Sequence, residues 1–138
     1  MAVLRITSAG ADLARLYPWL DAAADAAALP PSVLNGMHVA LEEAVANVAM
    51  HAYPADAPGE IAIRLTRLPD GAAALTVEDR GPPFDPTAAP AHPPHPASIQ
   101  DAEPGGLGLT LMRHYCSAIA YERVDGTNRL ILRFAAPA

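Results

Sequence analysis

Residues 42–51 read EEAVANVAMH, a pattern that predicts a helix with one polar face. Successive residues of an α-helix are about 100° apart, so Glu43, Asn47 and His51 fall on one helix face. An apolar stripe lies beside this polar face and consists of Met37, Leu41, Ala44, Val45 and Val48. A helix of this kind is anchored by its apolar stripe and can line a cleft with its polar one. An ordinary solvated helix face gives the same pattern.

The polar side chains of this helix suit a particular chemistry. The carboxylate of Glu43 is able to accept a proton, and the side-chain oxygen of Asn47 is the uncharged kind of ligand that Mg²⁺ takes. These two residues are therefore a candidate base and a candidate metal ligand.

A second segment, residues 77–86, reads VEDRGPPFDP. Asp79 stands at the end of a predicted strand, and Gly81 follows two residues later. The pair places a hydrogen-bond acceptor beside backbone that a flat ligand can approach closely. A turn with an aspartate cap explains the same residues.

A third segment, residues 105–111, reads GGLGLTL at the start of a predicted helix. Glycines there expose backbone N–H groups, and the helix dipole favours an anion such as phosphate. Leu111 stands where the dinucleotide-binding motif has its third glycine, so that motif is excluded. A glycine-rich helix start does not by itself establish a site.

The remaining chain supplies strands and helices in an order that predicts the fold class. We expect strands at 3–7, 60–68, 73–79, 118–123 and 129–134, and helices at 12–28, 32–53 and 108–117. Ser32 is the expected cap of the second helix, and residues 125–128 are the expected last turn. The order predicts one α+β domain over 1–138, a two-layer sandwich with a mainly antiparallel sheet covered on one face by helices.

Between residues 81 and 106 the composition changes sharply. Eight of the fifteen prolines lie between Pro82 and Pro104, so we expect a loop that acts as a lid over about 82–105. His92 and His95 in this loop are spaced as a pair of metal ligands could be. Because no further ligands accompany them, we interpret the two histidines as incidental.

Charge and composition exclude several classes of function. A net charge of −6 argues against nucleic acid as a partner. All nine basic residues are Arg, which excludes the P-loop and the eukaryotic-type protein kinase, since both need a Lys. No apolar run is long enough for a membrane span, and we expect a cytoplasmic protein. Cys116 is alone and is interpreted as a small buried residue.

Taken together, the three segments resemble the N, G1 and G2 boxes of the Bergerat-type ATP-binding fold of gyrase, heat-shock chaperones, histidine kinases and MutL repair proteins. Their close spacing, with His51-Ala52-Tyr53 after the first box, is most similar to the anti-sigma-factor serine/threonine kinases. The resemblance covers nearly the whole chain.

The resemblance implies a role for each matching residue. Glu43 would be the general base and Asn47 would hold Mg²⁺ against the phosphates of ATP. For the adenine, Asp79 would bond the amino group, Gly81 would leave room for the ring, and Thr127 would support it. Gly106 and Gly108 would hold phosphates under the lid. Members of this family often carry a basic residue where this chain has residues 103–105, which leaves Arg80 or Arg113 as substitutes.

The same resemblance implies an activity and partners. The protein would phosphorylate a serine of an anti-anti-sigma protein of the STAS type and would sequester a sigma factor, as a homodimer. An ATP-binding regulatory module that switches partner binding without phosphotransfer is the alternative. A stand-alone histidine-kinase domain is disfavoured, because no separate helix pair with an acceptor His is present and His38 and His51 lie in the predicted ATP-binding helix itself.

Overall fold

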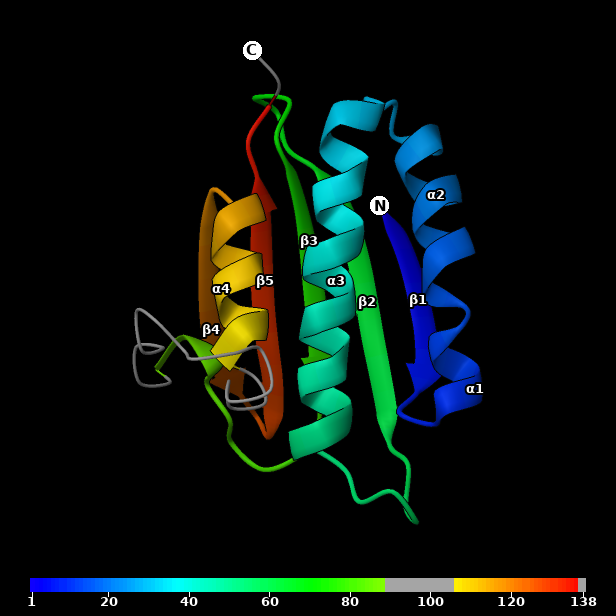
Figure 1. Cartoon of the computed structure of the whole chain (residues 1–138), viewed down its shortest axis with the longest axis vertical. Helices are drawn as coiled ribbons and strands as arrows, with labels where there is room; N and C mark the ends of the chain where they lie inside the picture. Colours follow the sequence, from blue (N-terminus) through cyan, green and yellow to red (C-terminus); the bar gives the residue numbers. More distant parts are fainter. Residues whose placement is uncertain (89–105, 137–138) are drawn as a thin grey trace.

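The computed structural model describes residues 1–88 and 106–136 (Figure 1). In chain order its elements are β1 (Ala2–Thr7), α1 (Gly10–Leu13), α2 (Leu16–Ala26), α3 (Pro31–His51), β2 (Glu60–Arg67), β3 (Ala73–Asp79), the 3₁₀ turn η1 (Pro86–Ala88), α4 (Gly106–Tyr115), β4 (Ala118–Val124) and β5 (Thr127–Phe134).

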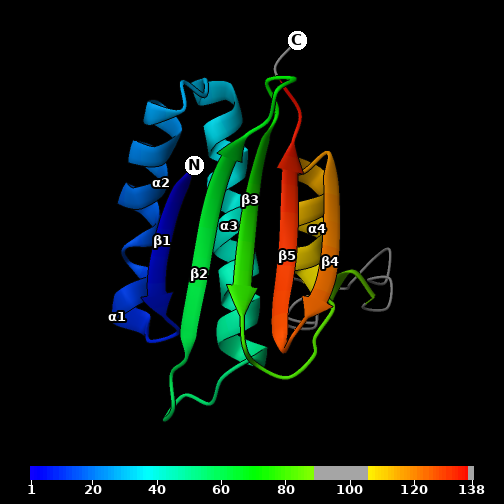
Figure 2. The same ribbon diagram turned by 180° about the vertical axis from the view of Figure 1, so that it is seen from behind.

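The five strands form one sheet in the order β1-β2-β3-β5-β4, and every neighbouring pair is antiparallel. The helices lie on one face of this sheet (Figure 1), and Figure 2 shows the opposite face with none of the described helices on it. The predicted α+β sandwich with one covered face is therefore confirmed. Within residues 1–88 and 106–136, no helix combines the length and apolarity needed to cross a membrane.

The inward rows of β3 and β5 explain where a site lies. Alternate residues of a strand point to the same face, and the buried residues of β3 are Ala73, Leu75, Val77 and Asp79. The inward row of β5 is Asn128, Leu130, Leu132 and Phe134. Both rows are apolar except at one end, where Asp79 pairs with Asn128 across the two strands. The buried core thus ends in polar side chains at one end of the sheet.

Helices α3 and α4 run antiparallel and approach closely at two glycines. A Cβ on Gly36, in the second turn of α3, would lie 2.8 Å from Tyr115 Cδ1 at the end of α4. A Cβ on Gly108 would lie 2.7 Å from Glu43 Oε2. The start of α4 therefore faces the second half of α3, on the side that leads to Asn47.

The helix predicted over 12–28 is wrong, because the chain forms α1 and α2 in its place. Pro18 lies in the first turn of α2, where its missing N–H is tolerated, whereas in a continuous helix its ring would clash with the carbonyl of Ala14. The side chain of Asp12 accepts hydrogen bonds from the Thr7 backbone N–H at 2.8 Å and the Thr7 hydroxyl at 2.9 Å, which fixes α1 against β1.

Helix α3 and strand β5 also begin at residues other than those predicted. Helix α3 begins at Pro31 after the cap residue Pro30, so Ser32 lies inside the helix and caps nothing; proline is favoured at the first helical position because its fixed φ suits it. The last turn consists of Asp125 and Gly126, with φ of 52° and 77°, as in a two-residue hairpin turn of type I′. Strand β5 therefore begins at Thr127.

Candidate functional site

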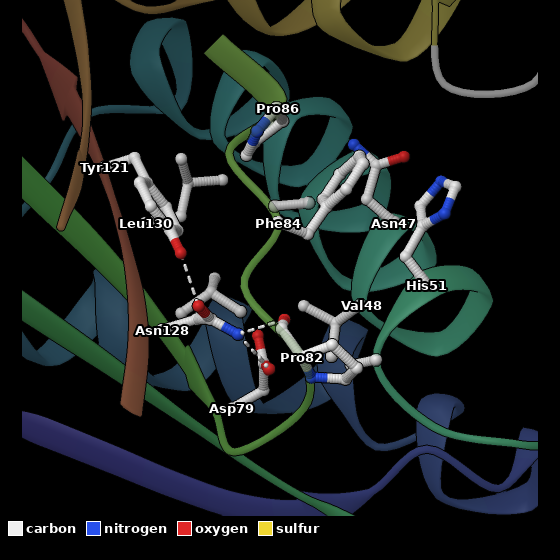
Figure 3. A pocket seen from close by; sticks show the side chains of 13 residues that line it. Asn47, Val48, His51, Asp79, Pro82, Phe84, Pro86, Tyr121, Asn128 and Leu130 are labelled. Carbon is white, nitrogen blue, oxygen red and sulfur yellow. Dashed lines mark hydrogen bonds between the residues drawn. The ribbon is translucent and has the colours of Figure 1, made fainter. Parts of the chain in front are cut away.

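A cavity lies at the polar end of the core, between α3 and the sheet (Figure 3). Helix α3 contributes Asn47, Val48 and His51 to its wall, and Asp79 stands at the end of β3. The opposite wall comes from the loop after β3 and from the last hairpin, with Pro82, Phe84, Pro86, Tyr121, Asn128 and Leu130. The structure therefore brings together the first and second segments that were selected from the sequence.

Asp79 is 8% exposed, and its carboxylate is held from two sides. Its Oδ1 accepts hydrogen bonds from the Gly81 backbone N–H at 2.9 Å and from the Asn128 side-chain amide at 2.9 Å. No hydrogen bond joins Oδ2 to another of the described residues. One carboxylate oxygen is thus occupied, and the other is available to a ligand in the cavity.

Asn128 is a site residue that the sequence reasoning missed. It is 4% exposed and lies directly opposite Asp79 in the register of β3 and β5. The signal that could have found it is the Asp-Gly turn at 125–126, which starts β5 at Thr127 and sends the next side chain inward.

The structure does not bring Thr127 to this cavity. Its side chain belongs to the opposite face of the sheet, where it lines a hollow of about 220 Å³ together with Arg5, Arg64 and Arg80 among others. Asp79 also borders this hollow, but Thr127 does not line the cavity that Asp79 shares with Asn47.

Asn47 and Glu43 lie at the end of the cavity nearest α4. Asn47 is 7% exposed, and its side chain makes no hydrogen bond to another residue of the described part of the chain. Glu43, one helical turn earlier and half-buried, directs its carboxylate toward Gly108. Gly106 begins α4, so the positive end of its dipole faces the same region. The third segment is therefore next to the first.

Gly81 lies against the residue that follows α3. A Cβ at this position would lie 2.5 Å from Ala52 Cβ and 2.6 Å from the Ala52 backbone. Because backbone atoms cannot move aside cheaply, the glycine is needed for the loop after β3 to pack against the end of α3. It shapes the cavity through that contact.

Phe84 narrows the cavity beside Asn47. Its ring stacks on that of His51, with 4.2 Å between centroids and 16° between planes. Both side chains are labelled in Figure 3. The enclosed space is about 30 Å³, enough for water but far below the roughly 300–1,000 Å³ of sites for larger organic ligands. A purine can enter only if this loop shifts.

Tyr53 braces the same end of the sheet. Its hydroxyl donates to the Glu60 carbonyl at 2.8 Å and accepts from the Arg80 backbone N–H at 2.8 Å, and its ring packs on Gly59. Burial raises the pKa of Tyr53, so the hydroxyl stays protonated and remains a donor. The tyrosine that follows the first segment therefore positions the strand ends beside Asp79.

Neither substitute arginine lies at the start of α4. Arg80 lines the hollow on the opposite face of the sheet, and Arg113 is in the last turn of α4, away from Gly106. By contrast, the guanidinium of Arg123 donates to the Gly81 carbonyl at 3.0 Å and to Asn128 Oδ1 at 2.8 Å. It serves the Asp79 end.

Parts of the predicted lid and the histidine pair lie outside the described residues. Of the lid at 82–105, residues 82–88 are described and residues 89–105 are not, and the latter include His92 and His95. Among the described residues, no group of three or more His, Cys, Asp and Glu is placed as a metal site requires.

The arrangement has a clear chemical polarity. At one end, Asp79 offers a fixed carboxylate oxygen to a hydrogen-bond donor on a flat, buried group. At the other end, the Asn47 amide, the Glu43 carboxylate and the N-terminus of α4 suit an anion and its counter-ion. A nucleotide carries both kinds of group in one molecule. The fold and the site together define an ATPase domain of the histidine-kinase type.

Comparisons with known proteins agree with this class. The model of the histidine kinase-like ATPase domain matches residues 6–134, and the chain belongs to that family. It is 42% identical over 91 residues to the serine/threonine-protein kinase BtrW of Bordetella bronchiseptica, over 66% of this chain and 63% of that protein. It is 28% identical over 106 residues to the serine-protein kinase RsbW of Bacillus licheniformis, over 73% of this chain and 64% of that protein.

The chain thus spans slightly under two thirds of the length of these two relatives. A chain in the crystal structure of the SiaB–SiaC complex from Pseudomonas aeruginosa has the same fold, with a TM-score of 0.57 and 18% identity over 97% of this chain and 89% of that chain. The resemblance to serine kinases of this fold, predicted from the three segments, is confirmed by BtrW and RsbW.

Proposed function

We propose that this chain is a serine/threonine protein kinase that binds Mg·ATP and phosphorylates a serine of a STAS-type anti-anti-sigma protein. The observation that carries the proposal is that Asn47 and Asp79, both buried, line one cavity from α3 and β3. Glu43 and the glycine-rich start of α4 lie one helical turn beyond Asn47. The names of both relatives, which are serine kinases, also support it.

The adenine would lie at the Asp79 end. Asp79 Oδ2 would accept a hydrogen bond from its exocyclic amino group, and the apolar side chains of Val48, Val77 and Leu130 would pack on the ring. Gly81 keeps this wall closed by packing on Ala52. Asn128, which donates to Asp79 Oδ1, would hold the carboxylate for this contact.

The phosphates would extend toward α4, where the backbone of Gly106 and Gly108 and the helix dipole favour negative charge. Mg²⁺ fits this end, because the buried amide of Asn47 has an oxygen free of other described partners and such oxygens are ligands of Mg²⁺. When bound, the ion neutralises charge on the phosphates.

The transfer needs one base. Glu43 would take the proton of the serine hydroxyl while the serine oxygen forms a bond to the γ-phosphorus and the bond to the β-phosphate oxygen breaks, so ADP leaves. The enzyme contributes mainly positioning and charge stabilisation to such a step. Glu43 is suited to it because its carboxylate is half-buried and is held beside the start of α4.

The same resemblance suggests further partners. We propose that the chain sequesters a sigma factor and forms a homodimer, and that phosphorylation of the STAS-type protein decides which partner is bound. Light scattering of the purified chain, alone and mixed with each candidate, measures both assemblies.

Radiolabelled ATP tests the activity. The purified chain is incubated with labelled ATP, Mg²⁺ and each regulator encoded near its gene, and a serine-to-alanine form of each regulator is the control. Label on the regulator that requires its serine supports the kinase. Nucleotide binding without label on any regulator contradicts it.

One observation favours the alternative, an ATP-binding module that switches partner binding without phosphotransfer. In the described part of the chain, neither Arg80 nor Arg113 lies at the start of α4, where transition-state charge would be stabilised. Partner binding that depends on ATP, without transfer and unaffected by Glu43→Ala, would establish that reading.

A further inference from the structure

The last hairpin sends three polar side chains to the Asp79 end of the cavity. Asn128 comes from β5, and Tyr121 and Arg123 come from the edge strand β4. The amide nitrogen of Asn128 donates to Asp79 Oδ1 at 2.9 Å and to the Pro82 carbonyl at 2.9 Å, so one side chain holds both the carboxylate and the loop that follows it (Figure 3).

The orientation of the Asn128 amide is determined by its neighbours. Its Oδ1 accepts from the Arg123 guanidinium at 2.8 Å and from the Tyr121 hydroxyl. Arginine has donors and no acceptor, so the amide oxygen must face β4. The amide nitrogen must then face Asp79, which is the orientation that a carboxylate requires.

This network limits what Asp79 offers to a ligand. Oδ1 already accepts two N–H groups, from Gly81 and from Asn128, which is the capacity of a carboxylate oxygen. Rotation of the carboxylate would break both bonds. Both residues are buried, with 8% of the surface of Asp79 and 4% of that of Asn128 exposed. Oδ2 is left as a fixed acceptor.

We propose that Asn128 is the positioning residue that sets the base specificity of this site, held in orientation by Arg123 and Tyr121. This inference rests on the proposed nucleotide binding. A fixed acceptor matches the amino group at position 6 of adenine and opposes the carbonyl oxygen at that position of hypoxanthine. Without Asn128, only the Gly81 N–H among the described residues holds the carboxylate, so its orientation is less restricted and the discrimination weakens.

Calorimetric titration of the full chain with ADP and with IDP tests this, because the two differ at position 6 of the purine and in the proton on the adjacent N1. We expect the wild type to bind ADP at least about tenfold more tightly than IDP, and Asn128→Ala to reduce that ratio about fivefold or more. Thr76→Ala, on the outward face of β3, is the matched control and should keep the ratio.

A second variant keeps the test valid if Asn128→Ala does not fold. Arg123 is exposed, so Arg123→Ala should fold, and it removes the donor that orients the amide; we expect a smaller fall in the ratio. An unchanged ratio in both variants, or a wild type that binds ADP and IDP equally, overturns the inference and leaves nucleotide binding intact. A wild type that binds neither nucleotide overturns the proposed function as well.

Discussion

A methyl group on Gly108 would lie 2.7 Å from Glu43 Oε2, so the start of α4 and the proposed base are in direct contact. The atom that would be displaced is the end of a flexible side chain. Gly108→Ala should therefore fold, with a thermal midpoint equal to or above that of the wild type, since alanine is about 1 kcal/mol better than glycine in a helix. We expect phosphotransfer to fall at least about tenfold because the carboxylate is pushed aside.

Gly10→Ala is the matched control, because a Cβ there meets nothing within 4 Å. Circular dichroism melts and single-turnover transfer are measured on both variants. If Gly108→Ala transfers phosphate at the wild-type rate, the position of Glu43 beside α4 is not important for the reaction.

Removal of the proposed base should separate catalysis from binding. Glu43→Ala should lower transfer about 10²–10⁴-fold, the usual contribution of a general base, and leave ATP affinity nearly unchanged. Asn47→Ala should weaken Mg·ATP binding and transfer together. Single-turnover assays and calorimetry measure the two quantities, and transfer by Glu43→Ala at nearly the wild-type rate would mean that another group takes the proton.

Asp79→Asn can change the carboxylate oxygen that makes no hydrogen bond to another described residue. The retained oxygen can still accept from Gly81 and Asn128, so the fold should persist, while an amide N–H replaces Oδ2. A donor then faces the amino group of adenine, and we expect ATP affinity to fall by about 1–3 kcal/mol, roughly 5- to 150-fold. Calorimetry with ATP measures this, and equal affinity in the two proteins would remove Asp79 from the base site.

Binding of a nucleotide should separate Phe84 from His51, because their stack borders a cavity of about 30 Å³. The ring current of Phe84 shifts the proton resonances of the His51 ring, and NMR should record the loss of this shift when ADP is added. Phe84→Leu is the control, since its His51 resonances should already lie near the bound position. A His51 signal that does not move with saturating ADP contradicts the required loop shift.

Cys116 should be unreactive in the folded protein. Burial raises the pKa of its thiol to about 12, so at pH 8 only about one molecule in 10⁴ carries the thiolate that reacts. Because folding raises the pKa of this thiol from its ordinary value of 9.0, the protonated thiol stabilises the protein at low pH, and this contribution is lost as the pH rises from about 9 toward 12. Modification by Ellman's reagent should be slow in buffer and fast in urea; equal rates would mean that the thiol is accessible.

Local patterns were enough to predict much of this protein. The alternation of Ile61, Ile63 and Leu65 predicts β2, and the 3.6-residue period around Asn47 predicts which side of α3 faces the core. Both patterns are local, because the direction of a side chain within one element depends on that element alone. The three segments also carry enough residues at fixed spacing to indicate the family. Pro18 was the signal overlooked in the N-terminal helix.

Contacts between distant residues were decided only by the tertiary structure. Thr127 and Asn128 are adjacent in the chain, and a shift of one residue moves a side chain to the other face of a sheet. Only the register of β5 against β3 therefore places Asn128 beside Asp79. The contact of Gly81 with Ala52 and the stack of Phe84 on His51 likewise join segments that are separate in the chain. The sequence by itself indicated most of the candidate site residues but not Asn128, and packing decided which of them meet, because a side chain's neighbours across a core depend on the whole fold.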